Sequence, residues 1–211
     1  MKQSSRIILA IDELDEKKVL KVAKEVGSIV DAIKINYPTI LCCGLDIVKK
    51  LRKYSDIICD LKVADVPHVN KLIVSQAINA GAAGIICHGF VGRDSVEACI
   101  EASGGKDVFV VTEMSHPGGA TFLQVTAEQI AKMAVEVGAS GVVAPATRPE
   151  RIKRIREIVG KLKIISPGVG AQGGDPKETI KAGADYIIVG RSIYESENPR
   201  KEVERIAESI R

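Results

Sequence analysis

The chain has 211 residues, of which 45% are hydrophobic and 27% are charged. This balance suits one globular core, so we expect a single domain over residues 1–211. A net charge of +3, only 3% aromatic residues and no tryptophan argue against nucleic-acid binding by a basic surface or a base-stacking platform. No apolar run is long enough to span a membrane, and residues 1–6 hold no signal-peptide core. We therefore expect a cytoplasmic protein with neither a membrane nor a nucleic-acid partner.

The five cysteines are odd in number and show no C-x-x-C spacing. Most of them lie in apolar segments, which predicts reduced core residues of a cytosolic protein. Two basic runs, 148–156 and 161–163, lie on or beside a predicted helix and are interpreted as a solvated helix face.

Short β-branched runs alternate with longer segments of helical periodicity along the chain. Eight strands and eight helices, in units of about 26 residues, predict an α/β fold, a single (β/α)8 TIM barrel. An open doubly wound sheet is the competing fold, and the glycine positions described below favour the barrel. We expect helices that include 16–26, 69–80, 127–137 and 199–210, and strands at 6–11, 32–35, 57–62, 84–88, 108–112, 141–144, 163–166 and 186–190.

Three short patterns predict where helices begin. Asp175 is followed by Pro176 and, three residues on, by Glu178, which is typical of an N-cap, a first turn and a capping glutamate. Capping-box spacing also occurs in two other pairs, Thr126 with Gln129 and Thr147 with Glu150.

The loops after the seventh and eighth strands, 166–175 and 189–192, are rich in glycine, and the second contains Arg191. In phosphate-binding barrels the anion lies between these two loops. Glycines let backbone N–H groups approach the oxygens, and an arginine adds charge and a donor fork. The Gly-x-Gly-x-x-Gly pattern that begins at Gly168 resembles a dinucleotide fingerprint, but a fingerprint belongs to the first βα turn of a Rossmann unit. The sequence therefore predicts a phosphorylated substrate and no nicotinamide cofactor.

Four charged residues follow neighbouring strands near their carboxyl ends. Asp60 and Lys62 are two apart on the third strand, so they share a face. Lys34 lies on the second strand, and Asp12 ends the first. Charges that point into a barrel are unfavourable unless they are paired. Two aspartates and two lysines at one end of the barrel therefore indicate a functional site.

A specific pattern joins these residues to three later segments: Asp60-x-Lys62-x-x-Asp65 with Lys34 before it, then 113–118 (EMSHPG), 167–174 (PGVGAQGG) and 189–191 (VGR). Together they resemble the orotidine 5'-phosphate decarboxylase family, and the match runs in order from Asp12 to Arg191. The first motif alone is shared with sugar-phosphate relatives, the keto-gulonate-phosphate decarboxylase and hexulose-phosphate synthase group. By the family pattern those relatives place an acidic metal ligand where this chain has Lys34, so a lysine here favours metal-free chemistry.

The resemblance implies conversion of orotidine 5'-monophosphate to UMP and CO2, the last step of pyrimidine synthesis, without a cofactor. It assigns proton donation to Lys62 and places Asp60 near the substrate carboxylate. Lys34 and Asp65 complete an alternating network. It also implies a homodimer, in which Asp65 reaches across a twofold interface into the partner's site. The alternative for Asp65 is a cap of its own helix or turn.

The resemblance further assigns Asp12 and Lys34 to the ribose hydroxyls and Ser115 to the amide edge of the pyrimidine. One departure is Val69, where the family often has a threonine whose hydroxyl can reach the ribose. None of the three histidines is assigned to catalysis. The remaining substrate-binding residues implied are Val66, Pro167, Gln172, Gly190 and Arg191, with Gln172 on a mobile loop over the phosphate.

The sequence leaves three alternative functions open. The first is a sugar-phosphate decarboxylase or aldolase of the same barrel group, which metal dependence would distinguish. The second is a Schiff-base aldolase that uses Lys62. The third is a catalytically idle phosphate-binding or regulatory barrel, against which the intact set of Asp60, Lys62 and Asp65 argues.

Overall fold

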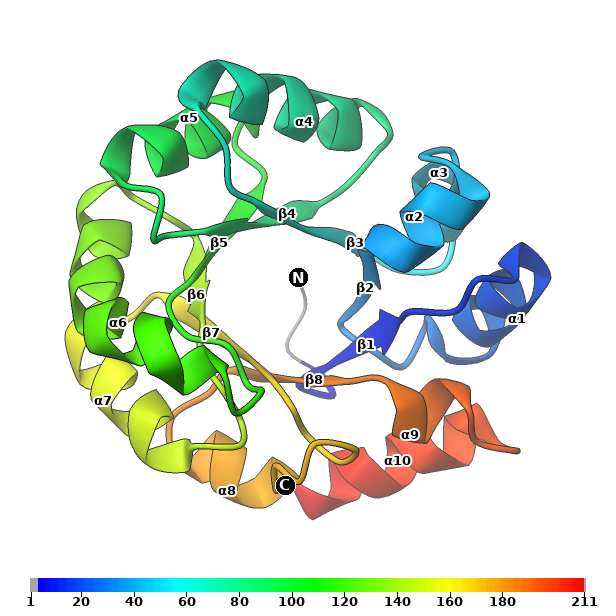
Figure 1. Ribbon diagram of the computed structural model, residues 1–211. Coiled ribbons are helices and arrows are strands. Elements are labelled where there is room, and N and C mark those ends of the chain that lie inside the picture. The colour runs from blue at the N-terminus through cyan, green and yellow to red at the C-terminus, as the bar shows by residue number, and fades with distance from the viewer. Residues whose placement is uncertain (1–3, 211) are drawn as a thin grey trace.

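The computed structural model describes residues 4–210, which form a closed barrel of parallel strands in the order β1 to β8, with β8 paired to β1. Figure 1 shows the strands as a central ring with the helices around it. The predicted (β/α)8 fold is confirmed. The strands are β1 (Ile7–Ile11), β2 (Ala32–Asn36), β3 (Ile57–Val63), β4 (Gly84–His88), β5 (Asp107–Val111), β6 (Gly141–Val143), β7 (Lys163–Pro167) and β8 (Tyr186–Val189).

The described residues hold ten helices rather than the eight expected. The two extra ones arise because two helices lie between β2 and β3 and two follow β8. The helices are α1 (Glu16–Val26), α2 (Tyr37–Cys43), α3 (Ile47–Leu51), α4 (Pro67–Asn79), α5 (Arg93–Ala102), α6 (Gly119–Glu136), α7 (Pro149–Val159), α8 (Pro176–Lys181), α9 (Arg191–Tyr194) and α10 (Pro199–Ser209).

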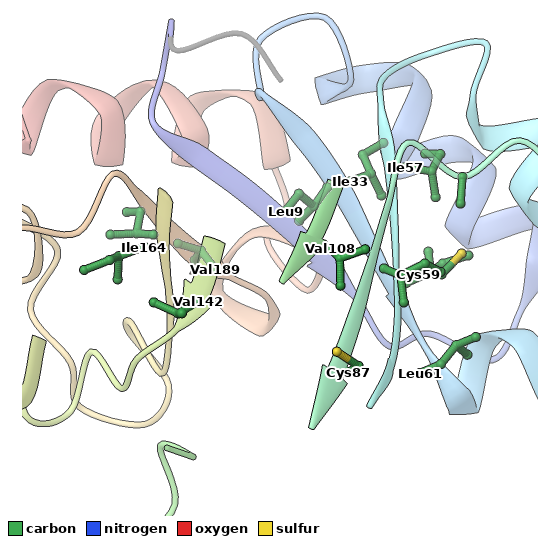
Figure 2. Packing of buried hydrophobic residues seen from close by; sticks show 14 of the residues in the cluster. Leu9, Ile33, Ile57, Cys59, Leu61, Cys87, Val108, Val142, Ile164 and Val189 are labelled. Atoms are coloured by element: carbon green, nitrogen blue, oxygen red, sulfur yellow. The ribbon is translucent and has the colours of Figure 1, made fainter. Parts of the chain in front are cut away.

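Alternation along each strand separates two apolar layers. In β1, Leu9 belongs to the layer between the barrel and its helices, whereas Ile8 belongs to the barrel interior. Figure 2 shows strand residues of the outer layer, Leu9 and Ile33 among them. Phe109 is the largest fully buried side chain of the interior. The strands are buried on both faces, which explains their nearly continuous apolar sequences.

The helix starts test the three capping predictions. Asp175 is the N-cap of α8, and its carboxylate accepts from the Glu178 N–H at 2.8 Å, as predicted. The other two pairs are not caps. Thr126 lies inside α6, where its hydroxyl donates to the Leu123 carbonyl. Thr147 precedes α7 and donates instead to the Ser115 carbonyl at 2.8 Å. Capping-box spacing alone is therefore not enough to predict a cap, because both threonine hydroxyls donate to backbone carbonyls instead.

The cysteines divide into two groups. Cys59, Cys87 and Cys99 are buried, as expected for core residues, whereas Cys42 is exposed and Cys43 is partly exposed on α2. The expectation of core positions is therefore wrong for these two, because α2 is a short helix that buries little of its surface. Among the helices of residues 4–210, none has the length and apolar character needed to cross a bilayer.

Candidate active site

A pocket of about 350 Å³ opens at the carboxyl ends of the strands. Its floor consists of inward-facing barrel residues, among them Ala10, Ile86 and Ile188. The structure therefore places the polar groups directly above the apolar interior. Most of the predicted site residues line this one pocket: Asp12, Lys34, Asp60, Lys62, Ser115, Pro167, Gln172, Gly190 and Arg191.

Asp60 is the centre of an ion network in the pocket. Lys34 Nζ lies 2.9 Å from Asp60 Oδ2, and Lys62 Nζ lies 2.9 Å from Oδ1 and 3.0 Å from Oδ2. Asp60 and Lys34 are 4% and 5% exposed. Burial acts to raise the pKa of the Asp60 carboxyl, but the charges and hydrogen bonds of the two lysines outweigh it and hold the pKa below its usual value. Asp60 is therefore ionised although it is shielded from water.

The sheet register brings these groups together. Lys34 pairs with Ile58 across β2 and β3, and Asn36 pairs with Asp60. Lys62 departs from ordinary strand geometry, because its φ is +40° and the register between β3 and β4 shifts around it. Asp60 and Lys62 both line this pocket, although the strand is irregular at Lys62.

Glu113, which follows β5, is a second buried carboxylate at the mouth of the barrel and is 0% exposed. Arg148 Nε and Arg151 Nε lie 2.7 Å and 2.9 Å from its two oxygens. Arg148 also donates to the Met114 carbonyl. The interpretation of 148–156 as a solvated helix face is therefore wrong for these two arginines. Arg151 is on α7 and Arg148 is its N-cap residue. Since α7 packs against α6, these side chains extend inward to the buried Glu113 carboxylate.

The loop after β5 presents Ser115 to the pocket. Its hydroxyl donates to Gln172 Oε1 at 2.8 Å, and its carbonyl accepts from Thr147. Gln172 comes from the loop after β7, so this contact joins two loops across the mouth. Together with the arginines around Glu113, it fixes the backbone that carries Ser115.

The two loops predicted to hold phosphate lie side by side. The loop after β7 is tied to itself by the Gly170 N–H to the Gly174 carbonyl at 3.0 Å and by the Gly174 N–H to the Gly168 carbonyl at 2.9 Å. A Cβ on Gly174 would lie 2.7 Å from the Gly168 oxygen, so the close approach requires glycine. Gly190 precedes α9, and Arg191 is the first residue of that helix and is exposed. Each loop therefore presents backbone and side-chain donors to the same rim.

Comparison with known proteins agrees with this geometry. A model of the family described as "Orotidine 5'-phosphate decarboxylase / HUMPS family" matches residues 5–206. The chain belongs to this family. Proteins named orotidine 5'-phosphate decarboxylase from Methanosarcina mazei and Thermococcus kodakarensis are 57% and 49% identical, over 100% and 99% of this chain and 97% and 98% of their own lengths. The orotidine 5'-monophosphate decarboxylase of Methanocaldococcus jannaschii, solved with the inhibitor BMP, superposes with a TM-score of 0.92 at 44% identity, with 97% of each chain covered.

Two residues that the resemblance to orotidine 5'-phosphate decarboxylases assigns to the site lie outside the pocket lining. Asp65 is exposed, and its carboxylate accepts a hydrogen bond from the Val66 N–H at 2.7 Å. A local contact of this kind is what the alternative, a cap of its own helix or turn, predicts. The Val66 side chain is 60% exposed. Within this subunit, neither residue touches the Asp60 network in the contacts of the described residues. Val69 lies in the first turn of α4, which begins two residues before the predicted helix.

Sequence reasoning missed other residues of the decarboxylase pocket. Asn36, Met114 and His116 line it. Met114 and His116 lie in the segment 113–118, so this motif was the signal that could have identified them. Asn36 belongs to no motif, so the sequence holds no signal for it. In residues 4–210 no cluster of three or more acidic, histidine or cysteine side chains is arranged to hold a metal ion.

Proposed function

We propose that this protein decarboxylates orotidine 5'-monophosphate to UMP and CO2, the last step of UMP biosynthesis. The observation that carries the proposal is the ionised Asp60 held between Lys34 and Lys62 in a pocket that is also lined by Gln172 and Arg191. The names of relatives at 45–57% identity agree with it. The sugar-phosphate alternative is less favoured, because Lys34 occupies the position where that group places an acidic metal ligand.

The reaction needs a site that stabilises negative charge at C6 of the pyrimidine. The bond from C6 to the carboxylate breaks, CO2 leaves, and the electron pair stays on C6. The Lys62 ammonium attracts this pair and then transfers a proton to C6, which gives UMP and a neutral amine that solvent reprotonates. Fixed charges that face a developing anion stabilise it without reorganisation, which is the main catalytic contribution of such sites.

Repulsion between Asp60 and the substrate carboxylate contributes less. Two like charges about 4 Å apart repel by about 4 kcal/mol at an effective dielectric of about 20. Relief of that repulsion in the transition state accelerates the reaction by roughly a thousandfold. Attraction by Lys62 acts on the charge that actually develops, so we assign it the larger share.

The remaining residues bind the substrate away from C6. Asp12 and Lys34 contact the ribose hydroxyls, and Ser115 recognises the amide edge of the pyrimidine. Gln172 reaches the phosphate and, through its bond to Ser115, joins phosphate recognition to base recognition. Binding energy from the phosphate thereby favours closure over C6. Gly190 and Arg191 form the fixed part of the phosphate site, and Val66 and Pro167 complete the lining of the assembled pocket.

Incubation of the purified protein with orotidine 5'-monophosphate tests this function directly. We expect loss of substrate absorbance and formation of UMP, at the same rate with and without EDTA. No turnover by well-folded protein would overturn the proposal. Activity abolished by EDTA and restored by Mg²⁺ would instead favour the sugar-phosphate branch, and sugar-phosphate substrates would then be assayed.

The working unit we propose is a homodimer of one-domain subunits with active sites at their interface. Beside the pocket lies an apolar groove of about 720 Å³, whose lining includes Phe90, Phe122 and Val125, which are 56%, 80% and 80% exposed. Exposed apolar surface of this kind is typical of an interface. A second subunit would cover it, and the partner's loop would bring Asp65 toward Lys34 and Lys62 to balance their positive charge.

Subunit exchange between two inactive variants tests the shared site. Asp65→Asn and Lys62→Ala are each prepared as homodimers and mixed. In a heterodimer, one site carries both substitutions and the other carries none, so activity should rise toward half of wild type. No recovery, with exchange confirmed by mass spectrometry, would show that Asp65 acts within its own subunit.

A further inference from the structure

The pairing of β3 becomes irregular at the charged residues of the pocket. β3 pairs with β2 as far as Asp60. On the other edge, its register with β4 shifts between Cys59 and Val63. Lys62 lies in this irregular segment with φ +40°, in the left-handed region. That conformation is unfavourable for a residue with a Cβ, so neighbouring contacts must hold it.

Tyr37 makes such a contact, because its hydroxyl donates a hydrogen bond to the Leu61 carbonyl. This carbonyl belongs to the peptide group that joins Leu61 to Lys62. Rotation of that peptide about the N–Cα bond of Lys62 is the φ angle. A bond that fixes the Leu61 oxygen therefore fixes the backbone from which the Lys62 side chain projects.

Tyr37 is itself held in place as the first residue of α2, which Figure 1 shows beside the ends of β2 and β3. The Asn36 side chain accepts from the Tyr37 N–H at 2.7 Å. Thr39 donates its hydroxyl to the Ile11 carbonyl at 3.1 Å and so ties α2 to β1. Burial and the Asp60 charge both raise the pKa of Tyr37 above its usual value. The hydroxyl therefore remains a donor at neutral pH.

We infer that Tyr37 is a positioning residue, which holds the left-handed backbone of Lys62 and thereby aims its ammonium at the reacting carbon. This inference rests on the proposed role of Lys62 in decarboxylation. The ammonium has to stay hydrogen-bonded to Asp60 and also lie beside C6 of the substrate, so its position is narrowly restricted. A displacement of the catalytic group by about 1 Å is enough to lower the rate of such a reaction by about 100-fold.

Tyr37→Phe tests the inference, because it removes the hydroxyl and keeps the ring. We expect kcat for orotidine 5'-monophosphate to fall by about 10- to 100-fold. The KM and the Kd for UMP should stay within about threefold of wild type, because the phosphate and ribose contacts are intact. Tyr54→Phe, at a tyrosine that is 36% exposed and lies outside the pocket, is the matched control and should leave kcat unchanged.

A double substitution shows whether Tyr37 acts through Lys62. In a Lys62→Ala background, Tyr37→Phe should cause no further loss of kcat, because the side chain that it positions is gone. An equal fold-loss in both backgrounds, or wild-type kcat for the single variant, would overturn the inference.

A crystal structure of Tyr37→Phe gives a readout that does not depend on activity. A changed Lys62 backbone would support the inference, and an unchanged φ near +40° with the same contacts to Asp60 would contradict it. A wild-type protein that fails to decarboxylate orotidine 5'-monophosphate would refute the proposed function, whereas this structure decides separately whether Tyr37 holds the backbone.

Discussion

Two buried carboxylates at the mouth of the barrel each lie between two cations, but the cations are lysines in one case and arginines in the other. Asp60 lies between Lys34 and Lys62, and Glu113 lies between Arg148 and Arg151. An ammonium is a point charge that can give up a proton, whereas a guanidinium is a rigid planar donor that keeps its proton. The Asp60 cluster therefore suits proton transfer, and the Glu113 cluster suits support of the Ser115 loop.

The exposure of the cations reinforces this difference. Lys62 is 28% exposed and lines the pocket, so its ammonium can meet a substrate. The side chains of Arg148 and Arg151 are 19% and 15% exposed, and neither lines the pocket. Substitutions in the Asp60 cluster should therefore alter catalysis, and those in the Glu113 cluster should alter mainly stability.

The largest effect is expected at Lys62. Lys62→Ala should lower kcat/KM by about 10⁵-fold or more, on the order of 7 kcal/mol, because both attraction to the carbanion and proton donation are lost. The variant should still bind UMP, measured by calorimetry. Retention of even a tenth of wild-type activity would remove Lys62 from its role.

The next effect is a loss of stability at Glu113. Arg151→Ala leaves a fully buried carboxylate with one cation, so the free energy of unfolding should fall by about 3 kcal/mol. Urea denaturation measures this change. Arg154→Ala is the matched control on the same helix, because Arg154 is 51% exposed and its solvent-screened ion pairs should contribute little to stability. If Arg151→Ala lowered kcat/KM as Lys62→Ala does and left stability unchanged, the division between the clusters would be wrong.

The same contrast shows what sequence can predict. Lys34, Asp60 and Lys62 could be placed in one site because they follow neighbouring strands of a barrel, where alternation fixes the direction of each side chain. The contact between Glu113 and Arg151 joins residues 38 apart on different elements, and no periodicity predicts it. The left-handed backbone of Lys62 lies where β3 no longer pairs with β2 and where its register with β4 shifts. The sequence of β3 alone does not contain this information.

A smaller effect separates the two sides of the phosphate site. Arg191→Ala should raise KM strongly and lower kcat/KM. The loss of transition-state stabilisation should be roughly 1.5–3 kcal/mol, the range for a charge-assisted hydrogen bond. Gln172→Ala removes a neutral donor and should do less. Kinetics with a truncated substrate that lacks the phosphate provide the control, since it should be nearly indifferent to both changes. Equal impairment of that substrate by Arg191→Ala would contradict the assigned role.

The smallest effect concerns His88, a neighbour of the Asp60 cluster. Burial, with the Lys62 charge, lowers the pKa of His88 to about 4. In the unfolded chain, the pKa of His88 is the ordinary value of 6.5. Between about pH 4 and pH 6.5, His88 is therefore protonated in the unfolded chain and neutral in the folded protein. The stabilising contribution of neutral His88 is therefore complete above pH 6.5 and is lost as the pH falls toward 4. Urea denaturation across this range should show the decline in wild type and less of it in His88→Gln. An identical pH dependence in both would contradict the assignment.

The most direct test of the central claim is kcat/KM for Lys62→Arg. This variant keeps the positive charge beside Asp60 but cannot readily supply a proton to C6. If the Asp60 cluster works because its cation is a proton donor, activity should fall by at least about 10³-fold while UMP binding is retained. Activity within tenfold of wild type would show that charge alone is sufficient, and the contrast between the lysine and arginine clusters would then have no catalytic meaning.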